Sequence, residues 1–181
     1  MRATCGLALL QAALGVASSA APSSVCDIFS AAGTPCVAAH STTRALYAAY
    51  NGPLYQVMRN FGAPNNATFD VPLLAPGGAA NAGAQDAFCG AAPCHIFRIY
   101  DQSPQANHLD LGPPGGEWKH ADLPVNATAD AVTVGGRRAY GAYFETKQGY
   151  RNDATRGVAT GNEEETLYMV TSGTHVNGGC W

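Results

Sequence analysis

Apolar and polar residues alternate along several short stretches of the chain, the pattern of half-buried β-strands. Such alternation predicts strands over Leu54–Arg59 and Cys94–Tyr100. The run from Ala131 to Glu145 alternates on both sides of Gly135-Gly136, and glycine reaches the positive φ angles that a tight hairpin turn requires. The sequence from Thr166 to Ser172 predicts a further strand.

Two other stretches follow different patterns. Leu46, Tyr47 and Tyr50 have helix-like spacing, so we expect one or two helical turns within Ala38–Tyr50, ended by the following Asn-Gly-Pro. The stretch Phe61–Gly83 is rich in Gly, Pro, Asn and Ala and predicts a long irregular loop. Several short strands punctuated by Gly and Pro, without repeats or heptads, predict an all-β sandwich.

The N-terminus has the order of a secretory signal peptide. Arg2 is followed by an apolar run to about Ala17 and then by small residues. This core is too short for a membrane anchor, and small residues permit cleavage after Ala20 or Ala21. We therefore expect residues 1–20 to be a signal, residues 21–181 to form a secreted, extracellular protein, and no membrane association. A buried N-terminal helix is the alternative.

The length and charge of the chain limit the number of domains and the classes of partner that it could bind. The chain has 181 residues, enough for one domain, and its charged fraction is 13% with a formal net charge of −3. An apolar share of 46% argues against general disorder. With two lysines and one adjacent basic pair, Arg137-Arg138, the chain lacks the electrostatic footprint of a nucleic-acid binder.

The cysteines indicate an oxidising compartment. Cys5 lies in the expected signal, which leaves an odd number in the mature chain: Cys26, Cys36, Cys89, Cys94 and Cys180. Their spacing indicates two local loop clasps, and secretion favours disulfides over a zinc site built from Cys89, Cys94 and His95. Cys180 has no evident partner. Two N-x-Thr sequons, at Asn66 and Asn126, predict exposed loops that could carry glycans.

Catalytic signatures are scarce. The sequence has no G-x-S-x-G, P-loop, G-x-G-x-x-G or H-E-x-x-H motif. Its histidines lack metal-ligand spacing and are expected to be structural, so we expect neither a metal nor another cofactor; they are His40, His95, His108, His120 and His175.

A secreted, acidic β-protein with many aromatic residues points to polysaccharide, and glycoside hydrolysis requires two opposed carboxyl groups. The candidates by residue type are Asp86, Asp101, Glu117, Glu145 and Asp153, and their spacing selects no pair. The triplet Glu163–Glu165 is expected to lie in a solvated loop.

The stretch Ile99–Gly116 stands out because Asp101, Gln102, Ser103 and Asn107 are side chains that close loops by bonding nearby backbone groups. The favoured interpretation is a structured turn after a buried strand. The alternative is a polar rim that touches substrate.

Five stretches resemble one known family. The sequence CDIFSAAGTPCVAAHSTTRALYAAYNGPLYQVMR is similar to the start of the fungal α-L-arabinofuranosidase B catalytic domain, glycoside hydrolase family fifty-four. The stretches AQDAFCGAAPC, IYDQSPQANHL, GYRND and GTHVNGGC also resemble that family, so the similarity extends from about Cys26 to Cys180.

The resemblance implies a β-sandwich of jelly-roll, concanavalin-like type, and pairs Cys26 with Cys36 and Cys89 with Cys94. It implies a secreted, monomeric enzyme that releases terminal arabinofuranosyl groups from arabinan and arabinoxylan of plant cell walls, with retention of configuration. In the family a second cysteine follows the one at Cys180 and forms a vicinal disulfide lining the sugar pocket; here Trp181 stands in that place. Cys180 is therefore the one substrate-binding candidate.

The resemblance also divides the chain. It makes residues 21–181 the N-terminal part, about the first half, of the catalytic domain, without the family's C-terminal arabinose-binding β-trefoil. The family's nucleophile (a Glu) and acid/base (an Asp) lie beyond the position of Trp181, so no residue here inherits either role. We accordingly expect this polypeptide alone to be inactive and prone to aggregate. A non-catalytic sugar-binding module and a secreted structural protein are the alternatives.

Overall fold

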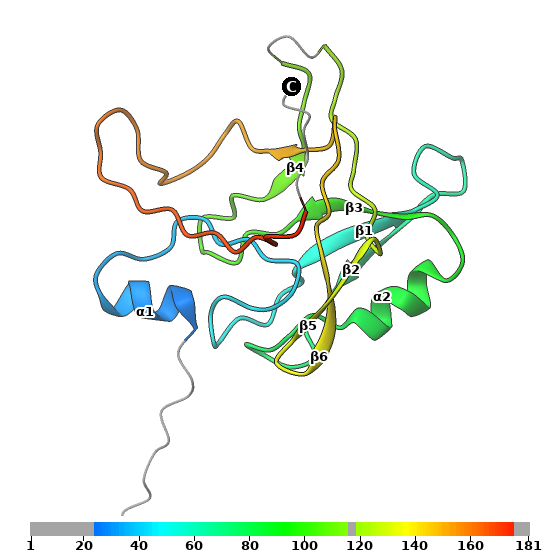
Figure 1. Cartoon of the computed structure of the whole chain (residues 1–181). Coiled ribbons are helices and arrows are strands. Elements are labelled where there is room, and N and C mark those ends of the chain that lie inside the picture. Colours follow the sequence, from blue (N-terminus) through cyan, green and yellow to red (C-terminus); the bar gives the residue numbers. More distant parts are fainter. Residues whose placement is uncertain (1–23, 116–118, 176–181) are drawn as a thin grey trace, which may run out of the picture.

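The computed structural model describes residues 24–115 and 119–175 (Figure 1). The expected signal at 1–20, the candidate Glu117 and the candidate Cys180 lie outside these residues. Within them the elements, in chain order, are α1 (Val25–Ala31), β1 (Tyr55–Arg59), β2 (Ala67–Val71), α2 (Ala82–Cys89), β3 (Cys94–Ile99), β4 (Leu109–Leu111), β5 (Asp130–Val134), β6 (Arg137–Gly141) and β7 (Tyr150–Arg151).

Five strands form an antiparallel sheet in the order β2-β1-β3-β4-β7. The predicted strands at 54–59 and 94–100 are confirmed as β1 and β3, which pair at the centre of the sheet. Tyr55 and Val57 of β1 are fully buried, as is Ile96 of β3, which accounts for the alternation seen in the sequence.

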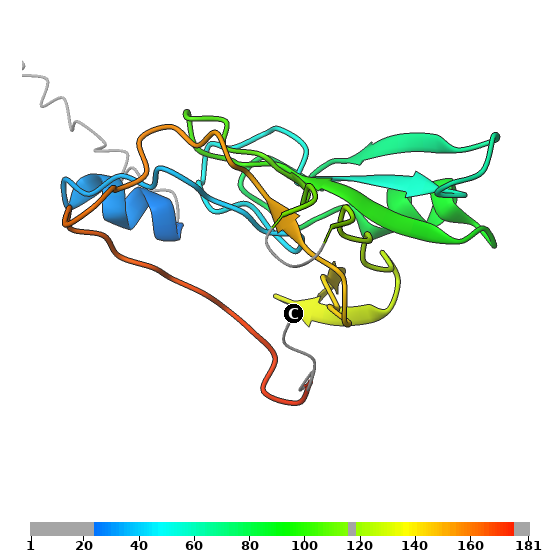
Figure 2. The ribbon, with the colours of Figure 1, turned by 90° about the horizontal axis from the view of Figure 1, so that it is seen from above.

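The predicted hairpin is confirmed as β5 and β6, joined by Gly135 and Gly136. Both glycines have positive φ, 56° and 74°, which is the backbone that a two-residue primed turn requires. The hairpin lies below the five-stranded sheet in Figure 2, and Ala139 belongs to the same apolar cluster as Val57 and Ile96. Two antiparallel layers therefore share one core, as in the all-β sandwich class that the sequence predicts.

The core joins both layers and the second helix. Its buried members include Leu54, Tyr55, Val57, Val71, Ala80, Cys89, Cys94, Ile96, Ile99, Val125, Ala127 and Ala139. Residues around Val125 and Ala127 extend the sheet, because the backbone N–H of Ile96 donates to Val125 and that of Ala127 donates to Cys94. Helix α2 packs against β2 and β6 and closes one end of the core.

The long loop predicted over 61–83 is wrong in part, because it contains β2 and the start of α2. Phe69 pairs with Val57 across the β1–β2 ladder and stacks on Phe88 of α2, with ring centroids 5.2 Å apart. Asn81 caps α2, since its side-chain oxygen accepts from the Ala84 N–H at 3.0 Å. The Gly- and Asn-rich composition concealed a short strand and a helix cap.

The helix predicted within 38–50 is also wrong; that stretch forms bends and turns. Its backbone donors have distant partners instead of helical ones: Ala39 N–H donates to Asp101, Ala45 N–H to Gly78 and Leu46 N–H to Gln102. The helix of this region is α1, which the sequence interpretation missed. Its N-terminus follows the capping pattern S-x-x-D, in which Ser24 N–H donates to the Asp27 carboxylate at 2.9 Å.

The strand predicted at 166–172 is not formed in the structure. No strand pair or isolated bridge among the described residues includes this stretch, and Leu167 is 84% exposed. A strand-like composition alone does not make a strand, because the backbone also needs a neighbour to pair with. Within the described ranges, no helix is long and apolar enough to cross a membrane.

Candidate functional site

Asp101, one of the candidate carboxylates, lies just after β3 and is 4% exposed. Its two oxygens accept four hydrogen bonds, from Ala39 N–H (2.7 Å), Ser103 N–H (2.8 Å), the Ser103 hydroxyl (2.6 Å) and Asn107 N–H (2.8 Å). A carboxylate offers about four lone-pair sites, so all of them are used. Asp101 therefore organises the loop and has no free oxygen for acid–base chemistry.

The rest of the loop ties distant segments together. Gln102 accepts from Leu46 N–H at 2.6 Å. The Asn107 amide donates to the carbonyls of Val37 and Arg156, and its oxygen accepts from Arg156 N–H, each at 2.8 Å. The favoured interpretation of this stretch, a structured turn, is confirmed.

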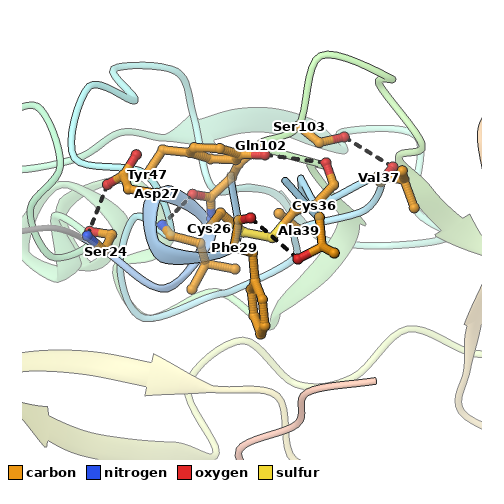
Figure 3. The surroundings of a disulfide bond; sticks show 12 residues. Ser24, Cys26, Asp27, Phe29, Cys36, Val37, Ala39, Tyr47, Gln102 and Ser103 are labelled. Atoms are coloured by element: carbon orange, nitrogen blue, oxygen red, sulfur yellow. Dashed lines mark hydrogen bonds between the residues drawn. A yellow bond between two sulfur atoms is a disulfide. The ribbon is translucent and has the colours of Figure 1, made fainter. Parts of the chain in front are cut away.

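Figure 3 shows where this loop meets the first disulfide. Gln102 and Ser103 approach the segment that follows Cys36, and the Ser103 hydroxyl donates to Val37 at 3.1 Å. The predicted pairs Cys26–Cys36 and Cys89–Cys94 are both confirmed as disulfides. The zinc alternative at Cys89, Cys94 and His95 is excluded because both thiols are consumed, and no group of metal-binding side chains occurs in the part of the chain that the structure describes.

Two further candidate carboxylates are held by arginines. Asp86 of α2 accepts from the Tyr140 hydroxyl at 2.7 Å and pairs with Arg138, which links the helix to β6. Asp153 accepts from two nitrogens of Arg151, at 2.6 and 3.3 Å. Both carboxylates are therefore engaged in ion pairs with arginines.

His40 and His108 form hydrogen bonds within the protein, as expected for structural histidines. His40 bonds the Asn107 carbonyl at 2.8 Å, and His108 accepts from Asp101 N–H at 3.0 Å through Nδ1. Burial, reinforced by the positive charge of Arg98, lowers the pKa of His108, and burial lowers that of His95. Both imidazoles are therefore held in their neutral form near neutral pH.

One open hollow of about 340 Å³ combines aromatic and polar groups; it is lined by Phe144, Glu145, Thr146 and His175. The His175 ring lies on Tyr143 with centroids 3.7 Å apart, and its Nε2 donates to the Phe144 carbonyl at 2.8 Å. We call this the His175 hollow. Aromatic faces and hydrogen-bonding groups together suit a sugar ring, and Glu145 is the one candidate carboxylate that lines it.

A second hollow, of about 450 Å³, lies along β4 and β7. The Arg98 guanidinium donates two hydrogen bonds, of 2.5 and 2.9 Å, to the Asp110 carboxylate on the neighbouring strand. The Arg151–Asp153 pair also lines this hollow. The sequence patterns did not single out Tyr143, Phe144, Arg98 or Asp110. The last two lie opposite each other in the β3–β4 register, so recognising Leu109–Leu111 as a strand would have found them.

The four candidate carboxylates in the described part of the chain lie on different segments. Asp101 is in the loop after β3, Asp86 is on α2, Asp153 follows β7 and Glu145 lines the His175 hollow. The triplet Glu163–Glu165 is exposed, as expected. The His175 hollow places Phe144 and His175 beside Glu145, a carboxylate that the sequence singled out.

The antiparallel sheets and the sequence together place this chain among the glycoside hydrolases. Residues 25–181 match the family described as "Alpha-L-arabinofuranosidase B, catalytic", and the chain belongs to that family. The "Alpha-L-arabinofuranosidase" of Hypocrea jecorina is 51% identical and the "Alpha-L-arabinofuranosidase B" of Emericella nidulans 50% identical, each over 159 residues. Both matches cover 86% of this chain and 31% of the relative, so the chain spans about a third of their length.

Solved structures agree. A crystal structure of an arabinofuranosidase complexed with arabinofuranosyl-α-1,2-xylobiose superposes with a TM-score of 0.73 at 45% identity, covering 77% of this chain and 29% of that one. A family fifty-four α-L-arabinofuranosidase soaked with a cyclic sulfate inhibitor gives a TM-score of 0.72 at 44% identity. The expected family is thereby confirmed.

Proposed function

We propose that this chain is part of the catalytic domain of an extracellular enzyme that releases terminal arabinofuranosyl residues from arabinan and arabinoxylan, with retention of configuration. The observation that carries the proposal is the family match over residues 25–181. It is supported by the superposition on an arabinofuranosidase complexed with an arabinofuranosyl-xylobiose.

Residues 21–181 provide the framework of that domain rather than its reacting carboxyl groups. Retaining glycosidases need two carboxyls about 5–5.5 Å apart, one as nucleophile and one as acid/base. Asp101, Asp86 and Asp153 are each committed to other partners, which supports placing the catalytic pair outside this stretch.

The His175 hollow is the sugar-facing part of the framework. Phe144 and His175 supply aromatic side chains, and Glu145 and Thr146 supply polar atoms for hydroxyl groups. Cys180 belongs to the same GTHVNGGC motif as His175, which is why we propose that it forms part of the sugar-binding wall.

An activity comparison tests this division. Residues 21–181, secreted and purified, are assayed on an arabinofuranoside beside the full-length Hypocrea jecorina relative. We expect turnover by the relative and none above background by residues 21–181. Turnover by the shorter protein that an arabinofuranosidase inhibitor abolishes would overturn the division.

A non-catalytic carbohydrate-binding module is the second candidate, and the aromatic lining of the His175 hollow favours it. Retention on insoluble arabinoxylan that is lost in His175→Ala but kept in Tyr168→Ala would support binding through this hollow. Tyr168 is a matched control because it is an aromatic residue, 62% exposed, that does not line the hollow. A cooperative melt without sugar binding would favour a structural protein.

The proposal also covers the secretion, glycosylation and partners of the protein. We propose a signal peptide over residues 1–20, secretion as a monomer, and glycans at Asn66 and Asn126, with polysaccharide rather than nucleic acid or membrane as the partner. Both asparagines are exposed, and Asn126 accepts from Thr128 N–H and from its hydroxyl at 2.9 and 3.0 Å. Glycosidase treatment of the secreted protein should lower its mass, and Asn→Gln variants should assign each site.

A further inference from the structure

One row of polar side chains crosses the five-stranded sheet from edge to edge. In the strand register, Gln56 of β1 is opposite both Asp70 of β2 and Arg98 of β3. Asp110 of β4 is opposite both Arg98 and Arg151 of β7. We call these five residues the polar row; in sheet order they are Asp70, Gln56, Arg98, Asp110 and Arg151. Neighbouring strands lie about 4.8 Å apart, so the row is about 19 Å long.

The polar row lies on the face of the sheet that points away from the core. Its neighbours along the strands, Tyr55, Val57 and Ile99, are buried in the core that the sheet shares with the β5–β6 hairpin (Figure 2). Successive side chains of a strand point to opposite faces, so Gln56 and Arg98 point outward. The side chain of Arg98 is 39% exposed. The row is therefore accessible to a ligand.

Hydrogen bonds hold the row in a fixed arrangement. The Gln56 amide and the Tyr100 hydroxyl both donate to the same oxygen of Asp70, each at 2.8 Å. Further along the row, Arg98 donates to both oxygens of Asp110. Groups that are already ordered bind a ligand with a smaller loss of conformational entropy.

The hollow of about 450 Å³ along β4 and β7 lies at one end of the polar row, because Arg98, Asp110 and Arg151 line it. Its volume is in the range of about 300–1,000 Å³ that is typical of ligand sites. His108 and Asn152 add further polar groups to its lining. The hollow shares no lining residue with the His175 hollow.

We propose that the polar row and this hollow bind the backbone of a neutral polysaccharide, an unsubstituted stretch of xylan. The inference rests on the arabinoxylan substrate proposed above. An arginine has five N–H donors and a carboxylate about four acceptor sites, so an Arg–Asp pair can bond internally and still reach hydroxyl groups, which donate and accept. An extended chain of sugar rings presents hydroxyls along its length, as the row presents its side chains.

Charge argues for a neutral ligand. Arg98 and Arg151 are each paired with a carboxylate, that of Asp110 and Asp153 respectively. Asp70 adds a further carboxylate, so carboxylates outnumber guanidiniums along the row, which disfavours a uronate or phosphate chain. Charged residues are depleted from the cores of protein–protein interfaces, which disfavours an apolar protein partner.

Titration with xylohexaose tests the proposal, because this neutral chain carries no arabinofuranosyl group and reports on the row rather than on arabinofuranosyl release. Monomer secreted from the full 181-residue chain is titrated by calorimetry and by NMR of the arginine Nε–H signals. We expect saturable binding that shifts the signals of Arg98 and Arg151 and leaves that of Arg138, on β6, in place. Hexagalacturonate, an anionic chain, should bind about 10-fold more weakly or worse.

A matched pair of double variants locates the site. Arg98→Ala with Asp110→Ala removes one ion pair of the row and should weaken xylohexaose binding about 10-fold or more, because hydrogen bonds to charged groups are the stronger kind. Arg138→Ala with Asp86→Ala removes an ion pair between β6 and α2 and should leave binding unchanged. Urea denaturation shows whether each variant is folded. If the row variant is unfolded, the NMR shifts in the parent protein decide.

Several results would overturn the proposal: no saturable binding of xylohexaose, equal weakening by the two double variants, tighter binding of hexagalacturonate, or shifts confined to the ring of His175. Absence of xylohexaose binding alongside turnover by the Hypocrea jecorina relative would overturn the role of the row and leave the proposed activity standing.

Discussion

Tyr55 of β1 donates its hydroxyl to the side-chain oxygen of Gln85 on α2 at 2.5 Å, and both residues are fully buried. The Gln85 amide in turn donates to the Ala127 carbonyl at 2.8 Å. One glutamine thus connects β1, α2 and the segment that extends the sheet.

Tyr55→Phe should destabilise the fold by about 1–3 kcal/mol, because it leaves the buried Gln85 oxygen without its donor. Urea denaturation followed by circular dichroism measures the free energy of unfolding. Tyr168→Phe is the matched control, because Tyr168 is 62% exposed. Removing its hydroxyl should change the free energy of unfolding by less than about 0.5 kcal/mol. Equal effects of the two variants would contradict this account of Gln85.

Asp101→Asn should lower the free energy of unfolding by about 1.5–3 kcal/mol. The amide cannot accept all four hydrogen bonds that the carboxylate accepts, and hydrogen bonds to charged groups are the stronger kind. Asp153→Asn breaks an exposed arginine pair and should cost only about 0–1 kcal/mol. A loss at Asp101 no larger than that at Asp153 would show that the loop does not depend on its carboxylate.

Removing the disulfide between Cys26 and Cys36 by paired alanine substitutions should cost about 2–3 kcal/mol on the chain-entropy estimate. The cysteines of the second disulfide, Cys89 and Cys94, are separated by 5 residues rather than 10, so its loss should cost slightly less. Thermal unfolding of the two double variants beside the parent protein makes the comparison. A clearly greater loss on removing the shorter loop would contradict the loop-length argument.

Stability should fall as the pH rises above about 10. Burial, assisted by a hydrogen bond to Asp70, raises the pKa of Tyr100 from 10.0 to about 12, and burial also raises the pKa of Tyr55 and Tyr150. The unfolded chain therefore ionises first, so the stabilising effect is complete below pH 10 and declines as the pH approaches 12.

Urea midpoints between pH 8 and 11 measure this decline. Tyr100→Phe should make this decline shallower, because it removes the hydroxyl whose pKa is raised. A slope that is equally steep in Tyr100→Phe and the parent would remove Tyr100 from the explanation.

Local signals predicted the centre of the fold. The hairpin followed from Gly135-Gly136 because a primed turn is decided by the conformational range of its own two residues. Strands β1 and β3 followed from alternation because one face of each is buried. These features need little information from elsewhere in the chain.

Features decided by distant partners escaped prediction. The stretch 38–50 is not helical because Asp101 and Gln102, far along the sequence, take its backbone donors. The stretch 166–172 has the composition of a strand, but no other described segment pairs with it. The motifs identified the family, but no spacing in the sequence indicated that Tyr143 and His175 would meet.

The loop centred on Asp101 has a consequence for biosynthesis. Asn107 joins Val37 to Arg156, so the contacts that secure the N-terminal quarter of the protein span more than a hundred positions. While the ribosome is still making the middle of the chain, Asn107 and Arg156 have not been synthesised. The contacts that hold the residues after α1 are therefore incomplete. We expect this N-terminal region to reach its native structure last. It should therefore be the part of the protein most accessible to proteases and chaperones during secretion.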